Sequence, residues 1–391
     1  MADARVYQER FLQEVARRKP DRPLSAAVRA AFLETPRHRF VQRYRSDPST
    51  WHDVDENNEP QLAVLYENRP LVLAADGDKV VSTISQPSLV LDMIDRLRLE
   101  PGHSVFELGT ASGWNAALMA HVVGPTGSVT SVEILPELAE SAAQLMRELG
   151  RDNVRVIHGD GGDGFAAAAP YDRAIFTAGT HDLPRAFYDQ LKDGGLLLVV
   201  LKLKGGGDTL FLLRKVGDHF ESIEASPCGF VPLTGKYALD GMDPIAIADV
   251  PEWSSLTRSV SQRRRFWWGL GGIPSAFQGK TFGFRGFLGI VEPALLGVFK
   301  RDDQHLLGFG LWTDDRRGLT IATDDDAITT YGAGDSAERF QRRLDEWFAL
   351  GMPDLSRFRL HAYPIDVMPA NAPSTLVTRL RESAFYWILD A

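Results

Sequence analysis

A regular alternation of apolar strands and amphipathic helices, from about residue 84 to residue 201, constrains the fold more than any other feature of the sequence. Strands are indicated at Ser104–Leu108, Ser128–Glu133 and Leu196–Leu201, and the first and last of these are short apolar runs. Helix-forming segments such as Asn115–Val123 lie between them. Because strands that alternate with helices of this length form parallel βαβ units, the pattern predicts an α/β fold with a doubly wound sheet.

A largely helical segment over residues 5–45 and a polar loop over residues 46–64 are expected before this alternation. Within the alternation, further helices are predicted at 89–97, 136–150 and 184–191, and further strands at 154–158 and 173–177.

The alternation stops after about residue 236, although the chain has 391 residues. A single hydrophobic core rarely grows beyond about 250–300 residues, so we expect two domains, residues 1–240 and a smaller α+β domain over residues 241–391. In the second domain the pattern predicts a helix over 257–270, short strands over 285–331, a helix over 337–350, and two strands, or a strand and a helix, over 357–390.

Composition excludes several classes of partner. A formal net charge of -9 argues against a nucleic-acid partner. The basic and aromatic stretch Arg263–Trp268 is therefore interpreted as a domain-packing segment, with a peptide-docking helix as the alternative. Cys228 is the single cysteine, so no disulfide can form within the chain, and the cytoplasm is the simplest compartment. The first twenty residues lack the apolar run of a signal peptide, and no apolar run is long enough to span a bilayer.

The first motif that points to chemistry is the turn Glu107-Leu108-Gly109-Thr110-Ala111-Ser112-Gly113-Trp114, which joins a predicted strand to a helix. Glycines there let the backbone approach a ligand, although such turns also serve plain packing. Glu133 ends the next strand, where an acidic side chain commonly binds ribose hydroxyls; the alternative is a solvated loop carboxylate.

The residues of this turn favour S-adenosylmethionine over a dinucleotide. The dinucleotide fingerprint G-x-G-x-x-G cradles a pyrophosphate, but position 111 is alanine and the turn begins with Glu107. An acidic residue suits a cofactor that carries an ammonium and a sulfonium group and has no phosphate.

A third string, Gly159–Phe165 followed by Ala169-Pro170-Tyr171-Asp172, comes directly after the strand at 154–158. It resembles the signature of the protein L-isoaspartyl (D-aspartyl) O-methyltransferase family, D-G-x-x-G-aromatic and then Ala-Pro-aromatic-Asp, with Ala174 where the family usually has isoleucine. Three further segments resemble the family in the same order, over roughly residues 10–240: Pro36–Val41, Thr83-Ile84-Ser85-Gln86-Pro87 and Val231–Thr234.

The resemblance implies a Rossmann-like class I methyltransferase sheet and S-adenosylmethionine as cofactor. It assigns the methionine part of the cofactor to Glu107, Gly109, Thr110, Ser112 and Gly113. It assigns the ribose to Glu133, and the adenine to Asp160 and Gly161. Ser85 would be the catalytic serine that hydrogen-bonds the acceptor carboxylate, and the peptide would contact Thr83, Ile84, Val231, Pro232, Leu233 and Thr234.

Methyl transfer to a carboxylate makes few chemical demands. A carboxyl group with a pKa near about 4 is already ionised at neutral pH, so no general base is needed and the work is positioning. The nine histidines show no metal-like pairing in the sequence, so no metal is expected.

The expected acceptor is a peptide, but the chain departs from the family pattern where the acceptor would enter. Residues 75–82 replace a glycine-rich lead-in, and the chain continues well past residue 240. It is similar in this to bacterial peptide-tailoring enzymes, which methylate an ordinary aspartate of a ribosomally made peptide so that an aspartimide forms. That function is preferred here, with residues 241–391 recognising the substrate. The alternatives are repair of L-isoaspartyl residues in damaged proteins and a non-catalytic peptide-binding protein, against which the presence of Ser85, Glu133 and Asp160 argues.

Overall fold

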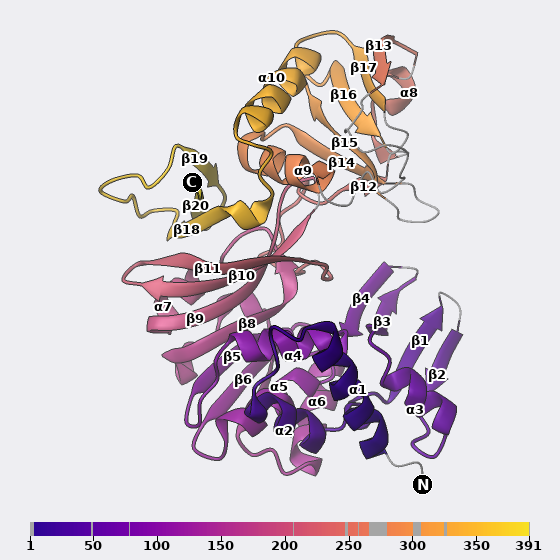
Figure 1. The fold of residues 1–391 in the computed structure, drawn as a ribbon, viewed down its shortest axis with the longest axis vertical. Coiled ribbons are helices and arrows are strands. Elements are labelled where there is room, and N and C mark those ends of the chain that lie inside the picture. The colour runs from indigo at the N-terminus through magenta and orange to yellow at the C-terminus, as the bar shows by residue number, and fades with distance from the viewer. Residues whose placement is uncertain are drawn as a thin grey trace.

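The computed structural model describes residues 4–47, 50–77, 79–205, 207–246, 249–256, 258–265, 280–299, 306–323 and 327–390. In Figure 1 the N-terminal half forms the lower body, and an orange unit that carries α9 and α10 forms the upper one. The yellow C-terminal strands lie between them, beside the pink strands β10 and β11. None of the described helices is both long enough and apolar enough to cross a bilayer.

The N-terminal region consists of three helices, a 3₁₀ turn and a small antiparallel sheet. Its elements are α1 (Ala4–Arg18), α2 (Ala26–Glu34), a 3₁₀ turn (Arg37–Phe40), β1 (Arg43–Asp47), β2 (Thr50–Asp53), α3 (Glu59–Leu65), β3 (Leu71–Asp76) and β4 (Lys79–Ile84), with the strand order β2-β1-β3-β4.

The polar loop expected over residues 46–64 is wrong, because β2 and α3 occupy most of it. The helix α3 has only seven residues, too few for an apolar period to stand out, yet Asn58 caps it and Leu62 and Leu65 are buried. The strand β2 is polar because it belongs to a small sheet, in which Trp51 lies beneath the guanidinium of Arg43.

The predicted doubly wound sheet is confirmed. Five parallel strands lie in the order β7-β6-β5-β8-β9, so the chain runs outward from β5 on one side and returns to β8 on the other. The carboxyl ends of β5 and β8 therefore border a topological switch point, where ligands bind in such sheets. The elements are α4 (Pro87–Arg96), β5 (Ser104–Leu108), α5 (Trp114–Val123), β6 (Ser128–Glu133), α6 (Pro136–Glu148), β7 (Val154–His158), β8 (Tyr171–Thr180), α7 (Arg185–Gln190) and β9 (Leu191–Lys202).

The same sheet continues with five antiparallel strands in the order β10-β11-β18-β20-β19. They are β10 (Asp208–Val216), β11 (His219–Cys228), β18 (Phe358–Pro364), β20 (Ser383–Leu389) and β19 (Leu376–Arg379). The last three strands of the chain thus extend the sheet that the first half builds. A division at residue 240 is not a division between sheets, and the limits of the two domains stay a prediction.

A second sheet of six strands, in the order β12-β14-β15-β16-β17-β13, forms the core of the upper unit. Its elements are β12 (Ile245–Ala246), α8 (Trp253–Leu256), β13 (Val260–Arg265), α9 (Lys280–Val291), β14 (Leu295–Phe299), β15 (Leu306–Trp312), β16 (Gly318–Thr323), β17 (Ala327–Gly332) and α10 (Ser336–Ala349).

The helix expected over 257–270 is wrong where the structure describes the chain, because residues 260–265 form β13. This strand pairs with β17, a tertiary contact that local sequence does not encode. Residues 266–270, and with them the whole aromatic part of Arg263–Trp268, lie outside the described residues. The strands expected over 285–331 begin later than predicted, since α9 runs to Val291.

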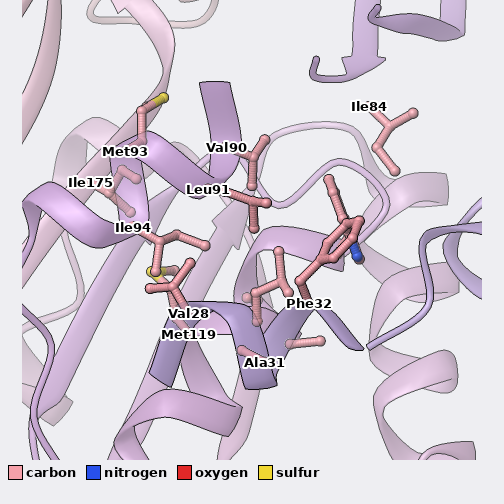
Figure 2. Close-up of a cluster of buried hydrophobic side chains, with 14 of the residues drawn as sticks. Val28, Ala31, Phe32, Ile84, Val90, Leu91, Met93, Ile94, Met119 and Ile175 are labelled. Carbon is pink, nitrogen blue, oxygen red and sulfur yellow. The ribbon is translucent and has the colours of Figure 1, made fainter. Parts of the chain in front are cut away.

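Two apolar cores cover the two faces of the main sheet. On one face, Val28 and Phe32 of α2 lie against Leu91 and Ile94 of α4, with Met119 of α5 beside them (Figure 2). On the other face the core is continuous with the upper unit. It joins side chains from both halves of the chain: Phe176, Phe187, Phe211, Phe220, Phe284, Trp347 and Trp387.

Candidate active site

A cavity with an empty volume of about 970 Å³, counting its open mouth, lies at the carboxyl ends of β5, β6 and β8. Of the residues singled out in the sequence, Glu107 and Gly113 are not among those that line it. The structure brings the others together around it: Thr83, Ile84, Ser85, Gly109, Thr110, Ser112, Glu133, Asp160, Gly161, Val231, Pro232, Leu233 and Thr234.

The turn after β5 approaches the cavity with an unusual backbone. Gly109 and Gly113 have φ angles of 91° and 81°, and Ala111 has a φ of 47°. A Cβ on Gly109 would lie 2.4 Å from the hydroxyl of Thr177, which donates to the carbonyl oxygens of Leu108 and Gly109. Position 109 therefore needs glycine for both its conformation and its space.

Glu107 lies behind the cavity wall. It is fully buried, and it accepts hydrogen bonds from Asn115 Nδ2 and Ser131 Oγ, both at 2.5 Å. Burial raises the pKa of its carboxyl to about 7. Asn115 Oδ1 is buried with no hydrogen-bond partner among the described residues, and Asn115 lines the cavity. Glu107 can therefore act on a bound group through Asn115, a residue that the sequence analysis did not select.

Glu133 ends β6 and joins two turns. Its Oε2 accepts from the backbone N–H of Ala111 at 2.7 Å, and its Oε1 accepts from that of Leu135 at 3.0 Å. Each carboxylate oxygen has a further lone pair, so the side chain can still accept hydrogen bonds from ligand hydroxyls.

Asp160 is held by backbone donors from two segments. Its Oδ1 accepts from Gly162 N at 3.0 Å, and its Oδ2 accepts from Lys236 N at 2.9 Å. A Cβ on Gly161 would lie 2.6 Å from Leu108 Cγ, so glycine lets this loop close over β5. The contact of Asp160 with Lys236 was missed because no motif marks that position.

Ser85 and Thr83 line both the cavity and an adjoining cleft with an empty volume of about 1090 Å³. Phe230, Val231 and Pro232 line both as well. The loop that carries them pairs with β8, since Gly179 N donates to Val231 O and Leu233 N donates to Gly179 O. A second molecule in the cleft would therefore meet a ligand in the cavity beside Ser85.

Arg37 fixes the backbone of this serine loop from below. The side chain is fully buried, and its guanidinium donates to the carbonyl oxygens of Leu65, Arg69, Ile84 and Ser85. Burial lowers the pKa of Arg37 to about 9, so it stays charged at neutral pH. The segment Pro36–Val41 had been noted in the sequence, but the role of Arg37 had not.

The cavity suits a ligand that carries positive charge. Among the described residues that line it, none is lysine or arginine, which argues against a phosphate-bearing cofactor. Acceptor groups are present instead, in the carboxylates of Glu133 and Asp160 and the unpaired Oδ1 of Asn115. Together with the doubly wound sheet, this site defines a class I S-adenosylmethionine-dependent methyltransferase.

Comparisons with known proteins place the chain within this class. The family model described as Protein-L-isoaspartate(D-aspartate) O-methyltransferase (PCMT) matches residues 13–238, so the chain belongs to that family and is an enzyme. The protein-L-isoaspartate O-methyltransferase of Ignicoccus hospitalis is 40% identical over 206 residues, which cover 53% of this chain and 88% of that protein. The enzyme of that name from Methanothermobacter thermautotrophicus is 36% identical over 214 residues, or 54% of this chain and 89% of that protein.

A solved protein-L-isoaspartate O-methyltransferase has a similar fold. The superposition has a TM-score of 0.55 at 24% identity, and it covers 90% of this chain and 96% of the other. Because the family model ends at residue 238, a superposition of this extent reaches into the C-terminal strands and the upper unit.

Proposed function

We propose that this protein transfers a methyl group from S-adenosylmethionine to the free α-carboxylate of L-isoaspartyl residues in peptides and proteins. The observation that carries the proposal is the position of Ser85, which lines both the cofactor cavity and the adjoining cleft. The names of the relatives support the isoaspartyl acceptor, since both Ignicoccus hospitalis and Methanothermobacter thermautotrophicus contain a protein named for it.

The described residues suggest how the cofactor is held. Asn115 Oδ1, fixed by the hydrogen bond that Asn115 donates to Glu107, accepts from the ammonium group. The carboxylate of Glu133 accepts from the ribose hydroxyls, and that of Asp160 from the adenine amino group. The turn from Gly109 to Gly113 lets the backbone lie against the methionine part.

On the acceptor side, the Ser85 hydroxyl donates to one carboxylate oxygen and leaves the other facing the cavity. When bound, the cofactor supplies a methyl group on a sulfonium centre. The acceptor is already ionised at neutral pH, so the protein needs no base and contributes by alignment. Apolar side chains of Ile84, Val231 and Leu233 line the cavity and exclude water from the reacting atoms.

The sequence analysis preferred an ordinary aspartate of a ribosomally made peptide as the acceptor, largely because the chain is extended. That argument is weakened, because a solved protein named protein-L-isoaspartate O-methyltransferase superposes on 90% of this chain. Peptide tailoring remains the second candidate for one structural reason. The changed lead-in at residues 75–82 contributes Lys79 and Val80 to the wall of the acceptor cleft.

Two synthetic peptides of identical sequence separate these functions, one with L-isoaspartate and one with L-aspartate at a central position. We expect methylation of the isoaspartyl peptide, measured as methyl ester by mass spectrometry, and no turnover of the aspartyl peptide. Ser85→Ala should lower kcat on the isoaspartyl peptide and leave cofactor affinity unchanged. If the aspartyl peptide alone is methylated, the assignment passes to peptide tailoring.

We also propose that residues 241–391 contribute to substrate recognition. The loop at 230–234 and the C-terminal strands are both attached to the main sheet, so contacts away from the reacting carboxylate could position it at Ser85.

A further inference from the structure

Three side chains that the mechanism does not use meet where β11 and β18 lie side by side. His219 and Glu221 stand two residues apart on β11, so both point to one face of the sheet. His361 of β18 is the register partner of Glu221. One ligand atom from each of the three lies within 4.8 Å of the others.

The separations match those between ligands of one small metal ion. Glu221 Oε1 lies 3.2 Å from His219 Nε2 and 3.9 Å from His361 Nδ1. With bonds of about 2.0–2.1 Å and tetrahedral angles, ligand atoms around zinc lie about 3.3 Å apart. Small rotations of the side chains would therefore bring all three atoms to bonding distance.

Neighbouring groups favour the tautomer and the ring orientation of His219 that a metal ion can bind. Its Nδ1 lies 3.3 Å from Asp218 Oδ1, so Nδ1–H can donate to that carboxylate and leave the Nε2 lone pair facing Glu221. Such a carboxylate behind a histidine is the usual outer support of a ligating imidazole. The ring of Tyr363 stacks on His219 at 4.4 Å with an interplanar angle of 6°, which fixes the plane of the imidazole.

We propose that His219, Glu221 and His361 form a binding site for a divalent zinc-type metal ion that clamps the C-terminal strands to the catalytic sheet. Two imidazoles and one carboxylate are a ligand set that zinc accepts, and water completes the tetrahedron, because Glu221 is 42% exposed.

The site is structural rather than catalytic. It lies at the start of β11, whereas Phe230, which lines the cofactor cavity, follows the end of that strand. A strand rises about 3.3 Å per residue, so the two places are roughly 30 Å apart. The strands β11 and β18 are in register only through Phe220–Ala362 and Glu221–His361, so a metal across this short seam would strengthen its attachment.

Sequence alone did not reveal this set. His219 and His361 are far apart in the chain, and only the pairing of β11 with β18 brings them together. The expectation that the histidines form no metal site was drawn from their spacing in the sequence, and that spacing carries no information about contacts between distant strands.

Thermal unfolding of the full-length chain tests the proposal. The protein is first treated with EDTA and then titrated with ZnCl2. We expect the Tm of the wild type to rise by several degrees with Zn²⁺ and to be unmoved by Mg²⁺, which prefers oxygen ligands. His219→Ala and His361→Ala should each weaken the zinc response at least about tenfold. His121→Ala, on α5 and away from the cluster, should retain it.

Cobalt offers a second measurement that does not depend on stability. Co²⁺ bound in a tetrahedral site gives visible absorption, which we expect in the wild type and in His121→Ala but not in either cluster variant. Cofactor affinity should be equal in the EDTA-treated and zinc-loaded protein, so this result is independent of the proposed methyltransferase activity. A wild type without a zinc response, or a response that survives in either His219→Ala or His361→Ala, overturns the proposal.

Discussion

The guanidinium of Arg37 donates to the backbone carbonyl oxygen of Ser85 at 3.1 Å. The same nitrogen lies 3.3 Å from the carbonyl oxygen of Ile84, so the serine loop rests on a buried cation. Arg37 also contacts the ring of Trp114, at 5.6 Å from the centroid, and Trp114 opens the helix that follows the glycine turn. One side chain thus supports both the acceptor loop and the start of α5.

Arg37→Lys should lower kcat by about 100-fold, because an ammonium cannot reproduce the planar fork and a misplacement of about 1 Å can cost that much. Cofactor affinity should change little, since the cofactor groups are held by other residues. Steady-state kinetics on an isoaspartyl peptide and calorimetry with the cofactor measure the two effects. Arg39→Lys, on the exposed side of the same turn, is the control. A wild-type kcat in Arg37→Lys would show that the loop does not depend on this contact.

Glu133→Gln should weaken cofactor binding by about 1–3 kcal/mol. One carboxylate oxygen becomes an amide NH2 group, which can no longer accept from the backbone N–H beside it or from a ribose hydroxyl. The turn that contains Ala111 should loosen as well, since Ala111 N donates to this side chain. Calorimetry gives the affinity. Glu137→Gln, an exposed change in the first turn of α6, is the matched control. Equal affinities in the two variants would remove Glu133 from the cofactor site.

The pH dependence of stability should carry the signature of Glu107. Burial raises the pKa of this carboxyl to about 7 from 4.5, so the folded chain binds its proton more tightly than the unfolded chain. Its stabilising contribution is complete below about pH 4.5 and is lost as the pH rises to about 7. The difference between the two pKa values corresponds to up to about 3 kcal/mol of the free energy of unfolding.

Denaturant unfolding of the wild type and of Glu107→Gln, at a series of pH values, isolates this contribution. The unfolding free energy of the wild type, relative to the variant, should fall across that window and stay level above it. A difference that does not change with pH would mean that the carboxyl of Glu107 has the same pKa in the folded and unfolded chain.

The parallel half of the sheet could be predicted from the sequence because each of its strands has a local sequence signal. The runs 104–108, 128–133 and 154–158 coincide with β5, β6 and β7. Each is a short run bounded by turn residues; β5 and β6 are buried along most of their length, whereas β7, at the edge of the sheet, is partly exposed. The joining of β18 to β11 has no such signal, because a register between distant strands is decided by tertiary packing.

Only those residues of the candidate site that belong to a sequence motif could be predicted. Ser85, Glu133 and Asp160 stand at strand ends or in marked loops, so their meeting in one cavity follows from the sheet topology. Arg37 and Asn115 act through burial and through hydrogen bonds to carbonyl and carboxylate groups, and neither is visible until the chain is folded.

Ala111→Gly should stabilise the protein, against the usual direction of this substitution. Ala111 has a φ of 47°, a left-handed conformation that costs an L-residue about 1–2 kcal/mol. Glycine avoids that cost but loses about 0.5–1 kcal/mol through chain entropy, so a net gain of up to about 1 kcal/mol is expected. The hydrogen bond from the backbone N–H of residue 111 to Glu133 is kept.

Ala143→Gly, within α6, is the control for this substitution and should cost about 1 kcal/mol. The free energies of unfolding from denaturant titration measure both changes. If the two variants were destabilised equally, the turn would not be strained at Ala111.

The C-terminal strands should be required for the methyltransferase half to fold. Trp387 of β20 is fully buried, with its ring 6.0 Å from that of Phe211 on β10. Polar contacts continue the attachment, because Glu382 N donates to Asp182 Oδ2 at 2.7 Å and Ser383 Oγ lies 3.0 Å from Tyr188 OH. A chain that ends at residue 240 would expose this core and the edge of β11.

We therefore expect residues 1–240 alone to aggregate, and co-expression with residues 241–391 to restore a soluble complex that binds the cofactor. A milder test keeps the whole chain. Trp387→Ala should lower the free energy of unfolding by about 3–5 kcal/mol, while Met368→Ala, at a side chain that is 75% exposed, should have little effect. Unfolding should also remain a single transition that cofactor shifts as a whole. A soluble 1–240 fragment that methylates an isoaspartyl peptide with the kcat and KM of the full chain would show that the C-terminal strands serve neither folding nor recognition.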